Sequence, residues 1–377
     1  MELAIVAQVQ RIFGVYYDEE GKNQVKNKFF FAWFSLWSTM GAEYGYLIVM
    51  PFWHWNIDTH VMRHSLAVVV ISMYIGQWIK SYTPWPRPYS PPVARLEKTY
   101  ISESTMPSTH ACLGAALPFS LLLFTSQIYS ISMPWGIFLA TFAFVNICLS
   151  RVYLGMHYVS DLVVGSAISF LVLKWLHPYV LLLDAIFVTH IEYAVATTVL
   201  LAAIFPTSGG SECGLRADTC RLLGVLCAAY LGAKFFYDRD MLQIPCPLPQ
   251  STKLSLKEEI FAGHRLAQCT FKFAIGLSVA LAVRAISRVV LHTFLTTMIS
   301  LFPSSIKKPA HVHLKRWGPY EVPFYYISYF LIAATIIIVT KYAYFYVGLT
   351  PDGHFSQYPV ILNVSKEDPF SYQCVQT

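Results

Sequence analysis

Charged residues are scarce in this sequence. Asp, Glu, Lys and Arg make up 13% of its 377 residues, whereas an ordinary soluble domain contains about 25%. Hydrophobic residues make up 55%, and the mean hydropathy is +0.49. This composition excludes an ordinary soluble protein and predicts a polytopic membrane protein. The net charge of +6 suits an anionic substrate or a membrane surface, but the basic residues form no patch of the kind that binds nucleic acid.

The sequence also shows no internal repeat and no metal-binding cysteine pattern, and we do not expect its first residues to be a signal peptide. The first 28 residues contain only a short apolar run and no clear cleavage site, so we expect an N-terminal tail. The eight cysteines show no metal-ligand spacing. Cys213 and Cys220 lie in one polar loop and would pair only if that loop faced an oxidising lumen.

Apolar runs of about 20 residues, the length that crosses a bilayer, recur along the chain. They predict an all-α, polytopic transmembrane bundle of about 8–10 spans. The nine expected spans lie near residues 29–53, 62–80, 108–126, 133–153, 158–176, 188–206, 219–237, 271–299 and 322–349. The expected regions are a tail (1–28), a transmembrane catalytic core (29–206), additional helices with a connector loop (207–350) and a second tail (351–377).

Three short clusters of polar residues interrupt this apolar pattern. They are "KSYTPWPRP" at 80–88, "PSTH" at 107–110 and "SRVYLGMHYVSD" at 150–161. The first ends the second expected span, the next begins the third, and the last joins the fourth span to the fifth. Because successive spans alternate in direction, all three clusters return to one membrane face. Ionisable groups at membrane depth are costly and usually functional, so the clusters predict a single site.

The cations of these clusters suit a phosphoryl group. Lys80, Arg87 and Arg151 match its spread negative charge, and guanidinium groups bind such oxygens in pairs. Rigid donors around a transferring phosphorus supply most of the catalysis. Ser108 and Thr109 stand at an expected helix start, where free backbone amides also favour an anion. We therefore expect these five residues to bind phosphate.

The remaining members of the clusters suit nucleophilic and acid–base roles. His157 and Asp161 are four residues apart and share one face of a helix. A carboxylate on one ring nitrogen leaves the other free to attack, so we assign His157 as the nucleophile and Asp161 as its partner. We assign His110 as the acid that protonates the leaving alkoxide and later activates water.

The pattern K-x6-RP, PSTH and SR-x5-H-x3-D resembles the type 2 phosphatidic acid phosphatase superfamily. The resemblance implies hydrolysis of lipid phosphates through a histidine nucleophile, with no metal and no other cofactor. Thr109 replaces the usual glycine of the family, as is typical of sphingosine 1-phosphate phosphatases. The stretches "GAEYGYLIVMPFWHWNID" (41–58) and "WPRPYSPPVARLE" (85–97) also resemble that subfamily. A sphingoid base phosphate is therefore the expected substrate.

Other acidic residues and histidines have more open interpretations. Glu43 and Glu97 are the nearest carboxylates outside the catalytic set, and are candidate contacts for the substrate's amine. Glu43 is equally consistent with polar packing inside the first span. We expect His54, His60 and His64 in a loop at the membrane interface, with no metal site.

The sequence leaves several functional alternatives open. They are a broader lipid phosphatase acting on phosphatidate or polyprenyl diphosphate, a glucose 6-phosphate-type phosphatase, a sphingolipid phosphotransferase like the sphingomyelin synthases, and a non-catalytic lipid binder or channel. The complete set of three phosphate-binding cations favours a terminal phosphomonoester over the transferase. Nothing in the sequence indicates an oligomeric state.

Two arguments about orientation disagree. Lys22, Lys26 and Lys28 favour a cytosolic N-terminus by the positive-inside rule. Two spans precede Lys80, which would make the site cytosolic as well. The family resemblance instead implies the endoplasmic reticulum membrane with a luminal site. We follow the resemblance, because the tail also carries acidic residues and the charge count includes residues of the site.

Overall fold

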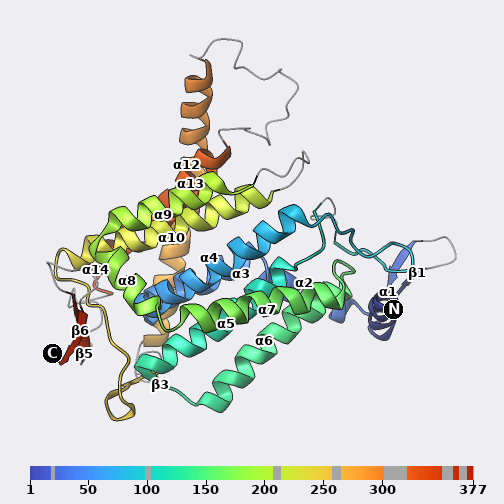
Figure 1. Cartoon of the computed structure of the whole chain (residues 1–377), viewed down its shortest axis with the longest axis horizontal. Coiled ribbons are helices and arrows are strands. Elements are labelled where there is room, and N and C mark those ends of the chain that lie inside the picture. Colours follow the sequence, from blue (N-terminus) through green and yellow to red (C-terminus); the bar gives the residue numbers. More distant parts are fainter. Residues whose placement is uncertain are drawn as a thin grey trace.

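The chain folds into a helical bundle with three small two-stranded sheets (Figure 1). The computed structural model describes residues 1–17, 22–97, 103–206, 214–256, 265–300, 321–349, 360–364 and 372–376. The helices are α1 (Glu2–Ile12), α2 (Lys28–Met40), α3 (Glu43–Asn56), α4 (Thr59–Tyr82), α5 (Thr109–Ile128), α6 (Met133–Tyr153), α7 (Val159–Leu176), α8 (Val180–Thr189), α9 (Ile191–Ile204), α10 (Leu215–Tyr237), η1 (Gln250–Thr252), α12 (Arg265–Ser300), α13 (Glu321–Ala334), the π-helical η3 (Thr335–Val339) and α14 (Thr340–Tyr346). The strands are β1 (Val15–Tyr17), β2 (Asn23–Val25), β3 (Tyr129–Ser130), β4 (Leu254–Ser255), β5 (Val360–Val364) and β6 (Tyr372–Gln376).

Six helices in the described part of the chain are long and apolar enough to cross a membrane, and the pair α8–α9, which is bent by 109°, adds a seventh if it forms one broken span. The protein is therefore a multi-pass membrane protein. Two other expected spans differ from this pattern. The first is divided into α2 and α3, and α4 is 24 residues long but contains polar residues such as Arg63, His64 and Gln77 that lower its hydropathy. The described residues thus contain six or seven candidate spans, fewer than the nine that the sequence predicts.

The N-terminal segment is folded against the bundle. The side-chain amide of Gln10 in α1 donates to the carbonyl oxygens of Ala94 and Tyr153 at 2.7 and 2.8 Å, and its oxygen accepts from the Ala94 amide at 2.8 Å. Glu2 accepts a hydrogen bond of 2.9 Å from the Ser160 hydroxyl at the start of α7. These contacts hold α1 at the end of the bundle where α6 ends and α7 begins.

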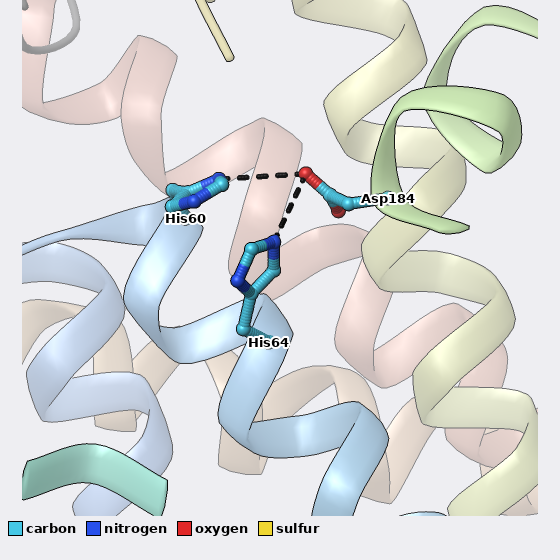
Figure 2. Close-up of side chains that lie close together, drawn as sticks. All are labelled: His60, His64 and Asp184. Atoms are coloured by element: carbon cyan, nitrogen blue, oxygen red, sulfur yellow. Dashed lines mark ion pairs between the residues drawn. The ribbon is translucent and has the colours of Figure 1, made fainter. Parts of the chain in front are cut away.

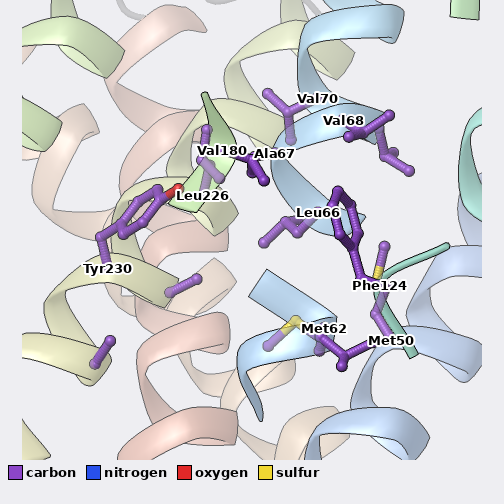
Figure 3. Packing of buried hydrophobic residues seen from close by; sticks show 14 of the residues in the cluster. Met50, Met62, Leu66, Ala67, Val68, Val70, Phe124, Val180, Leu226 and Tyr230 are labelled. Atoms are coloured by element: carbon purple, nitrogen blue, oxygen red, sulfur yellow. The ribbon is translucent and has the colours of Figure 1, made fainter. Parts of the chain in front are cut away.

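The largest apolar core lies where α4, α5, α8 and α10 meet, and includes Met50, Leu66 and Phe124 (Figure 3). Helix α10 also packs closely against α13. A Cβ atom on Gly224 would lie 2.4 Å from the carbonyl oxygen of Tyr326, so only glycine lets these two backbones approach so far. Close approach through small residues is the usual packing device where lipid supplies no hydrophobic drive between helices.

The opposite end of the bundle contains the two remaining sheets. Strand β3 directly follows α5 and pairs in parallel with β4, and the Leu248 amide donates to Gln127 at 2.9 Å. A disulfide joins Cys246 to Cys374 in β6, a pairing that the sequence analysis did not predict. Helix α5 has 20 residues and is about 30 Å long. The disulfide end of the bundle, where α5 finishes, is therefore about one helix length from the end where α5 starts. Cys220, expected in a polar loop, is buried in α10, and Cys213, with which it could pair, lies outside the described residues.

Candidate active site

The three polar clusters of the sequence meet at one end of the bundle. Lys80 lies in the last turn of α4, His110 in the first turn of α5, Arg151 in the last turn of α6 and Asp161 in the first turn of α7. Their exposed fractions are all 6% or less. Residues separated by 81 positions in the chain are thus buried together, as the alternation of the spans predicts.

The start of α5 is fixed against the start of α7. Ser108 is the N-cap of α5, and its hydroxyl accepts a hydrogen bond of 3.4 Å from the Ala111 amide. The Ser108 amide donates to the backbone carbonyl of Asp161 at 3.1 Å. Thr109 is the first residue of the helix. The positive end of the α5 dipole therefore lies beside the catalytic candidates, where it favours an anion.

His157 and Asp161 are in contact, but not on one helix face as expected, because His157 precedes α7 and Asp161 lies in its first turn. The ring Nδ1 lies 3.4 Å from Oδ2 of Asp161, and both side chains are 1% exposed. The opposite ring atom, Nε2, lies 3.4 Å from Nη1 of Arg87. Arg87 is held in place because the same Nη1 donates to the carbonyl of Met156 at 2.9 Å. One nitrogen of His157 thus faces a carboxylate and the other faces a phosphate-binding candidate.

Thr105 is a third member of this pair, and the sequence analysis missed it. Its hydroxyl donates to Oδ2 of Asp161 at 2.5 Å and lies 3.3 Å from Nδ1 of His157. The Tyr158 amide donates to the same Oδ2 at 2.8 Å. These donors fix the carboxylate in position beside the imidazole. A threonine just before "PSTH" was the available signal, but a loop sequence does not reveal where a side chain points.

Two of the three cations, which we call the cation cluster (Lys80, Arg87 and Arg151), are paired with acidic side chains. Nζ of Lys80 lies 3.0 Å from the Glu103 carboxylate, and Nη1 of Arg151 lies 2.6 Å from that of Glu97. Nε of Arg87 donates to the backbone carbonyl of Glu103 at 3.1 Å. Glu97 therefore lies at the site, as expected, and Glu103 is a further residue that the sequence analysis missed.

Burial and charge set the protonation state of the two groups in the loops of the site. Burial lowers the pKa of His157 well below its usual 6.5, and the nearby charges of Arg87, Arg151, Lys80 and His110 lower it further. The ring is therefore neutral at pH 7 and has a lone pair available for attack. Burial also lowers the pKa of Arg87, to about 10, so its guanidinium remains charged.

Gly155 makes the turn between Arg151 and His157. Its φ is +71°, and a Cβ atom there would lie 2.4 Å from the carbonyl oxygen of Ala94. The Met156 amide donates back to the carbonyl of Arg151 at 3.0 Å. This tight turn brings the last residues of α6 and the nucleophile candidate to one point, which explains a glycine within the third cluster.

Glu43 has different partners from Glu97. It lies 3.3 Å from Arg221 in α10 and 3.7 Å from Arg284 in α12, and Arg221 also pairs with Asp218 at 2.6 Å. The guanidinium of Arg221 lies over the ring of Tyr325 at 4.6 Å. Glu43 thus joins the first expected span to the C-terminal helices, and the polar-packing interpretation describes its position.

A second buried polar cluster lies near the other end of α4. His60 and His64 were expected in a loop, but both lie in α4, and their rings lie 3.4 Å from Oδ2 of Asp184 in α8 (Figure 2). His54, expected in the same loop, is buried in α3. His64 and Lys80 are 16 residues apart, about 24 Å along the helix, so this cluster is remote from the cation cluster.

The spacing of His60, His64 and Asp184 could hold a metal ion, because one ligand atom from each lies within 4.8 Å of the others. Asp184 is, however, already engaged by Arg63. Nε and Nη2 of this guanidinium donate to the two carboxylate oxygens at 2.5 and 2.7 Å. A divalent cation would lie beside this fixed positive charge and compete for the same oxygen. We interpret the cluster as an ion-pair network that joins α4 to α8.

Comparison with known proteins places this site in a family. The PAP2 superfamily profile matches residues 62–183, which contain all three polar clusters. The chain belongs to the PAP2 superfamily, and is a PAP2-type lipid phosphate phosphatase.

Its relatives include proteins named for sphingoid base phosphates. It is 30% identical over 342 residues to sphingosine-1-phosphate phosphatase 1 of Mus musculus, covering 88% of this chain and 76% of the relative. It is 31% identical over 331 residues to sphingosine-1-phosphate phosphatase 2 of the same organism, covering 86% and 91%. Dihydrosphingosine 1-phosphate phosphatase YSR3 of Saccharomyces cerevisiae is 33% identical over 144 residues, covering 36% and 35%. No solved structure matches the chain.

Proposed function

We propose that this protein hydrolyses sphingosine 1-phosphate and related sphingoid base phosphates, through a phosphohistidine at residue 157. The observation that carries the proposal is the placement of His157. Its Nδ1 faces Asp161 at 3.4 Å, while its Nε2 lies 3.4 Å from Arg87 of the cation cluster. A phosphate bound to the cation cluster would therefore meet a neutral imidazole nitrogen whose other face is supported by a carboxylate.

The first chemical step transfers the phosphoryl group to the protein. Nε2 of His157 attacks phosphorus, an N–P bond forms, and the bond from phosphorus to the ester oxygen breaks. Asp161 stabilises the positive charge that develops on the ring. His110 donates its proton to the departing alkoxide, so that the sphingoid base leaves as an alcohol. This proton transfer requires His110 to enter the cycle protonated.

The second step restores the protein. His110 is now neutral and takes a proton from water as that water attacks phosphorus. The N–P bond breaks, and inorganic phosphate and free His157 result. Lys80, Arg87 and Arg151 bind the phosphoryl oxygens in both steps, together with Ser108 and Thr109 at the start of α5. Fixed donors of this kind contribute most of the stabilisation of a phosphoryl-transfer transition state. No step requires a metal ion.

The choice of substrate is supported by the names of the relatives and by Thr109. The printed names of the relatives include sphingosine-1-phosphate and dihydrosphingosine 1-phosphate phosphatases. The alternatives are a broader lipid phosphatase, a glucose 6-phosphate-type phosphatase and a phosphotransferase. A substrate panel of sphingosine 1-phosphate, dihydrosphingosine 1-phosphate, phosphatidate and glucose 6-phosphate separates them. We expect sphingosine 1-phosphate to be cleaved at least about tenfold faster than phosphatidate, about 1.4 kcal/mol of transition-state preference. Equal rates would show a general lipid phosphatase.

We also propose the endoplasmic reticulum membrane as its location and the division into tail (1–28), catalytic core (29–206), additional helices (207–350) and second tail (351–377). The resemblance supports a luminal active site. The disulfide Cys246–Cys374, at the opposite end of the bundle, favours a cytosolic one, because disulfides persist in oxidising compartments. Labelling of cysteines from each side of the membrane decides between the two orientations.

Single-turnover labelling with radioactive substrate tests the assignment of the histidines. His157→Ala should form no phosphoenzyme. His110→Ala should lose about 10²–10⁴-fold on the lipid, the usual range for general acid catalysis, but much less on an activated aryl phosphate. Its phosphohistidine should also be hydrolysed slowly and accumulate. Label on His110, or an active His157→Ala without label on any form, would overturn the assignment.

A further inference from the structure

Two glutamates pair with members of the cation cluster in the structure. Glu97 binds Arg151 at 2.6 Å, and Glu103 binds Lys80 at 3.0 Å. The cation side chains are each 1% exposed, whereas the carboxylates are 20% and 11% exposed. Each glutamate is thus the outer member of its pair. A phosphate that reaches the buried cations takes over the hydrogen bonds that the glutamates accept now.

The three cations of the cluster lie near an equal number of carboxylates. Glu103 pairs with Lys80 and Glu97 pairs with Arg151, while Asp161 contacts His157 and its charge acts on Arg87 from nearby. A phosphate dianion adds two negative charges at the cations and releases two glutamates beside it. Like charges at such short range repel strongly in a buried site. A substrate whose positive charge lies next to its phosphate removes much of this repulsion.

A sphingoid base phosphate has that arrangement, because its ammonium group is two carbons from the phosphate ester oxygen. We propose that Glu97 and Glu103 exchange partners on substrate binding: they leave Arg151 and Lys80 and bind the substrate's ammonium group. This inference rests on the proposed function and deepens it, since it assigns the residues that select an amine-bearing substrate. A phosphatidate or lysophosphatidate leaves the released carboxylates without a cation.

The other nearby carboxylates are less suited to this exchange. Glu43 and Asp218 share Arg221, at 3.3 and 2.6 Å, and Arg221 is not part of the cation cluster. Phosphate binding therefore leaves Arg221 paired with these two carboxylates, and neither of them is released to bind an ammonium group. This argument favours Glu97 over Glu43 as the amine contact, and adds Glu103 to it.

The test compares sphingosine 1-phosphate with lysophosphatidate of matched chain length, which has a hydroxyl group in place of the ammonium group. The variants are Glu97→Gln, Glu103→Gln and the double variant, in the full chain. We expect the ratio of kcat/KM values, amine substrate over lysophosphatidate, to fall about tenfold or more in the double variant, the lower end for losing hydrogen bonds to a charged group. The rate with lysophosphatidate should rise, because its phosphate no longer displaces a carboxylate.

Vanadate inhibition gives a second measurement that does not depend on the amine. Vanadate competes with the glutamates for the same cations, so it should inhibit the Gln variants at lower concentration than wild type. Glu192→Gln is the matched control, because Glu192 is 64% exposed and pairs only weakly with His190 at 3.2 Å in the described structure. It should change neither the substrate ratio nor the inhibition.

The outcomes separate this inference from the proposed function. If wild type cleaves lysophosphatidate as fast as sphingosine 1-phosphate, the proposed substrate preference is refuted. If the Gln variants are in addition inhibited by vanadate at the same concentration as wild type, the exchange of partners is refuted as well. If wild type prefers the amine and the Gln variants keep that preference, only the exchange is refuted. An equal loss with both substrates, with unchanged vanadate inhibition, would show a structural role for the glutamates and refute the exchange as well.

Discussion

Replacing Thr105 with valine removes one hydroxyl and keeps the shape of the side chain. That hydroxyl donates to the Asp161 carboxylate at 2.5 Å and lies 3.3 Å from Nδ1 of His157. A hydrogen bond to a charged group contributes about 1.5–3 kcal/mol. If the carboxylate must stay in place for His157 to attack, Thr105→Val should lower kcat about 10- to 150-fold. The lower end is expected, because the Tyr158 amide still holds the same oxygen at 2.8 Å.

The assay is phosphate release from sphingosine 1-phosphate by purified protein, with kcat and KM measured separately. Thr105 does not touch the cation cluster through any contact described here, so KM should change little. Thr105→Ser keeps the hydroxyl and should recover most of the rate. Thr198→Val is the control for the loss of a threonine hydroxyl, because it removes a hydrogen bond of 2.8 Å to the neutral hydroxyl of Tyr326 in another part of the bundle. A folded Thr105→Val protein with kcat within about twofold of wild type, well below the loss expected for this bond, would refute the reasoning.

Three further expectations follow from the site. Gly155→Ala forces a Cβ atom to 2.4 Å from the Ala94 carbonyl at φ +71°, and should cost about 1–3 kcal/mol in a thermal unfolding measurement; Gly214→Ala, with no described atom within 4 Å, should not. Because the pKa of His157 is lowered, the acid limb of the pH profile of kcat/KM should lie below pH 6.5, and an acid limb above pH 6.5 would contradict this. The unfolded protein binds a proton at this histidine more readily than the folded protein, so the free energy of unfolding should decrease as the pH falls below 6.5. Phosphate release should survive excess chelator and be inhibited by vanadate; a loss restored by magnesium would contradict the metal-free steps.

Sequence spacing predicted the parts of the site that depend on helix direction. Lys80, His110 and Arg151 stand at ends of expected spans, and alternation of the spans is enough to bring them to one face. These inferences need only the apolar pattern and the positions of the charges within it. The sequence also predicted the contact between His157 and Asp161, but for the wrong reason. His157 precedes α7, which begins at Val159, so the two residues meet through the loop that enters the helix and not on one helix face.

The residues that the sequence did not predict depend on loop geometry. Thr105 and Glu103 lie in the segment between α4 and α5, where no period fixes the direction of a side chain. His60 and His64 were misplaced because α4 begins at Thr59, earlier than its apolar run, under an N-cap from Asp58. Their contacts with Asp184 depend on the packing of α4 against α8, which the apolar pattern alone does not predict.

The redox state of the Cys246–Cys374 pair in the cell also indicates how the protein is oriented in the membrane. Cys246 and Cys374 lie at the end of the bundle where α5 finishes, and His110 lies where α5 starts. The two ends of a crossing helix face different compartments, so these two cysteines and His110 lie in different redox environments. If Cys246 and Cys374 are oxidised in the cell, the dephosphorylated lipid would be released on the cytosolic side. If they are reduced, it would be released into the lumen. One thiol measurement thus reports on which side of the membrane the product appears.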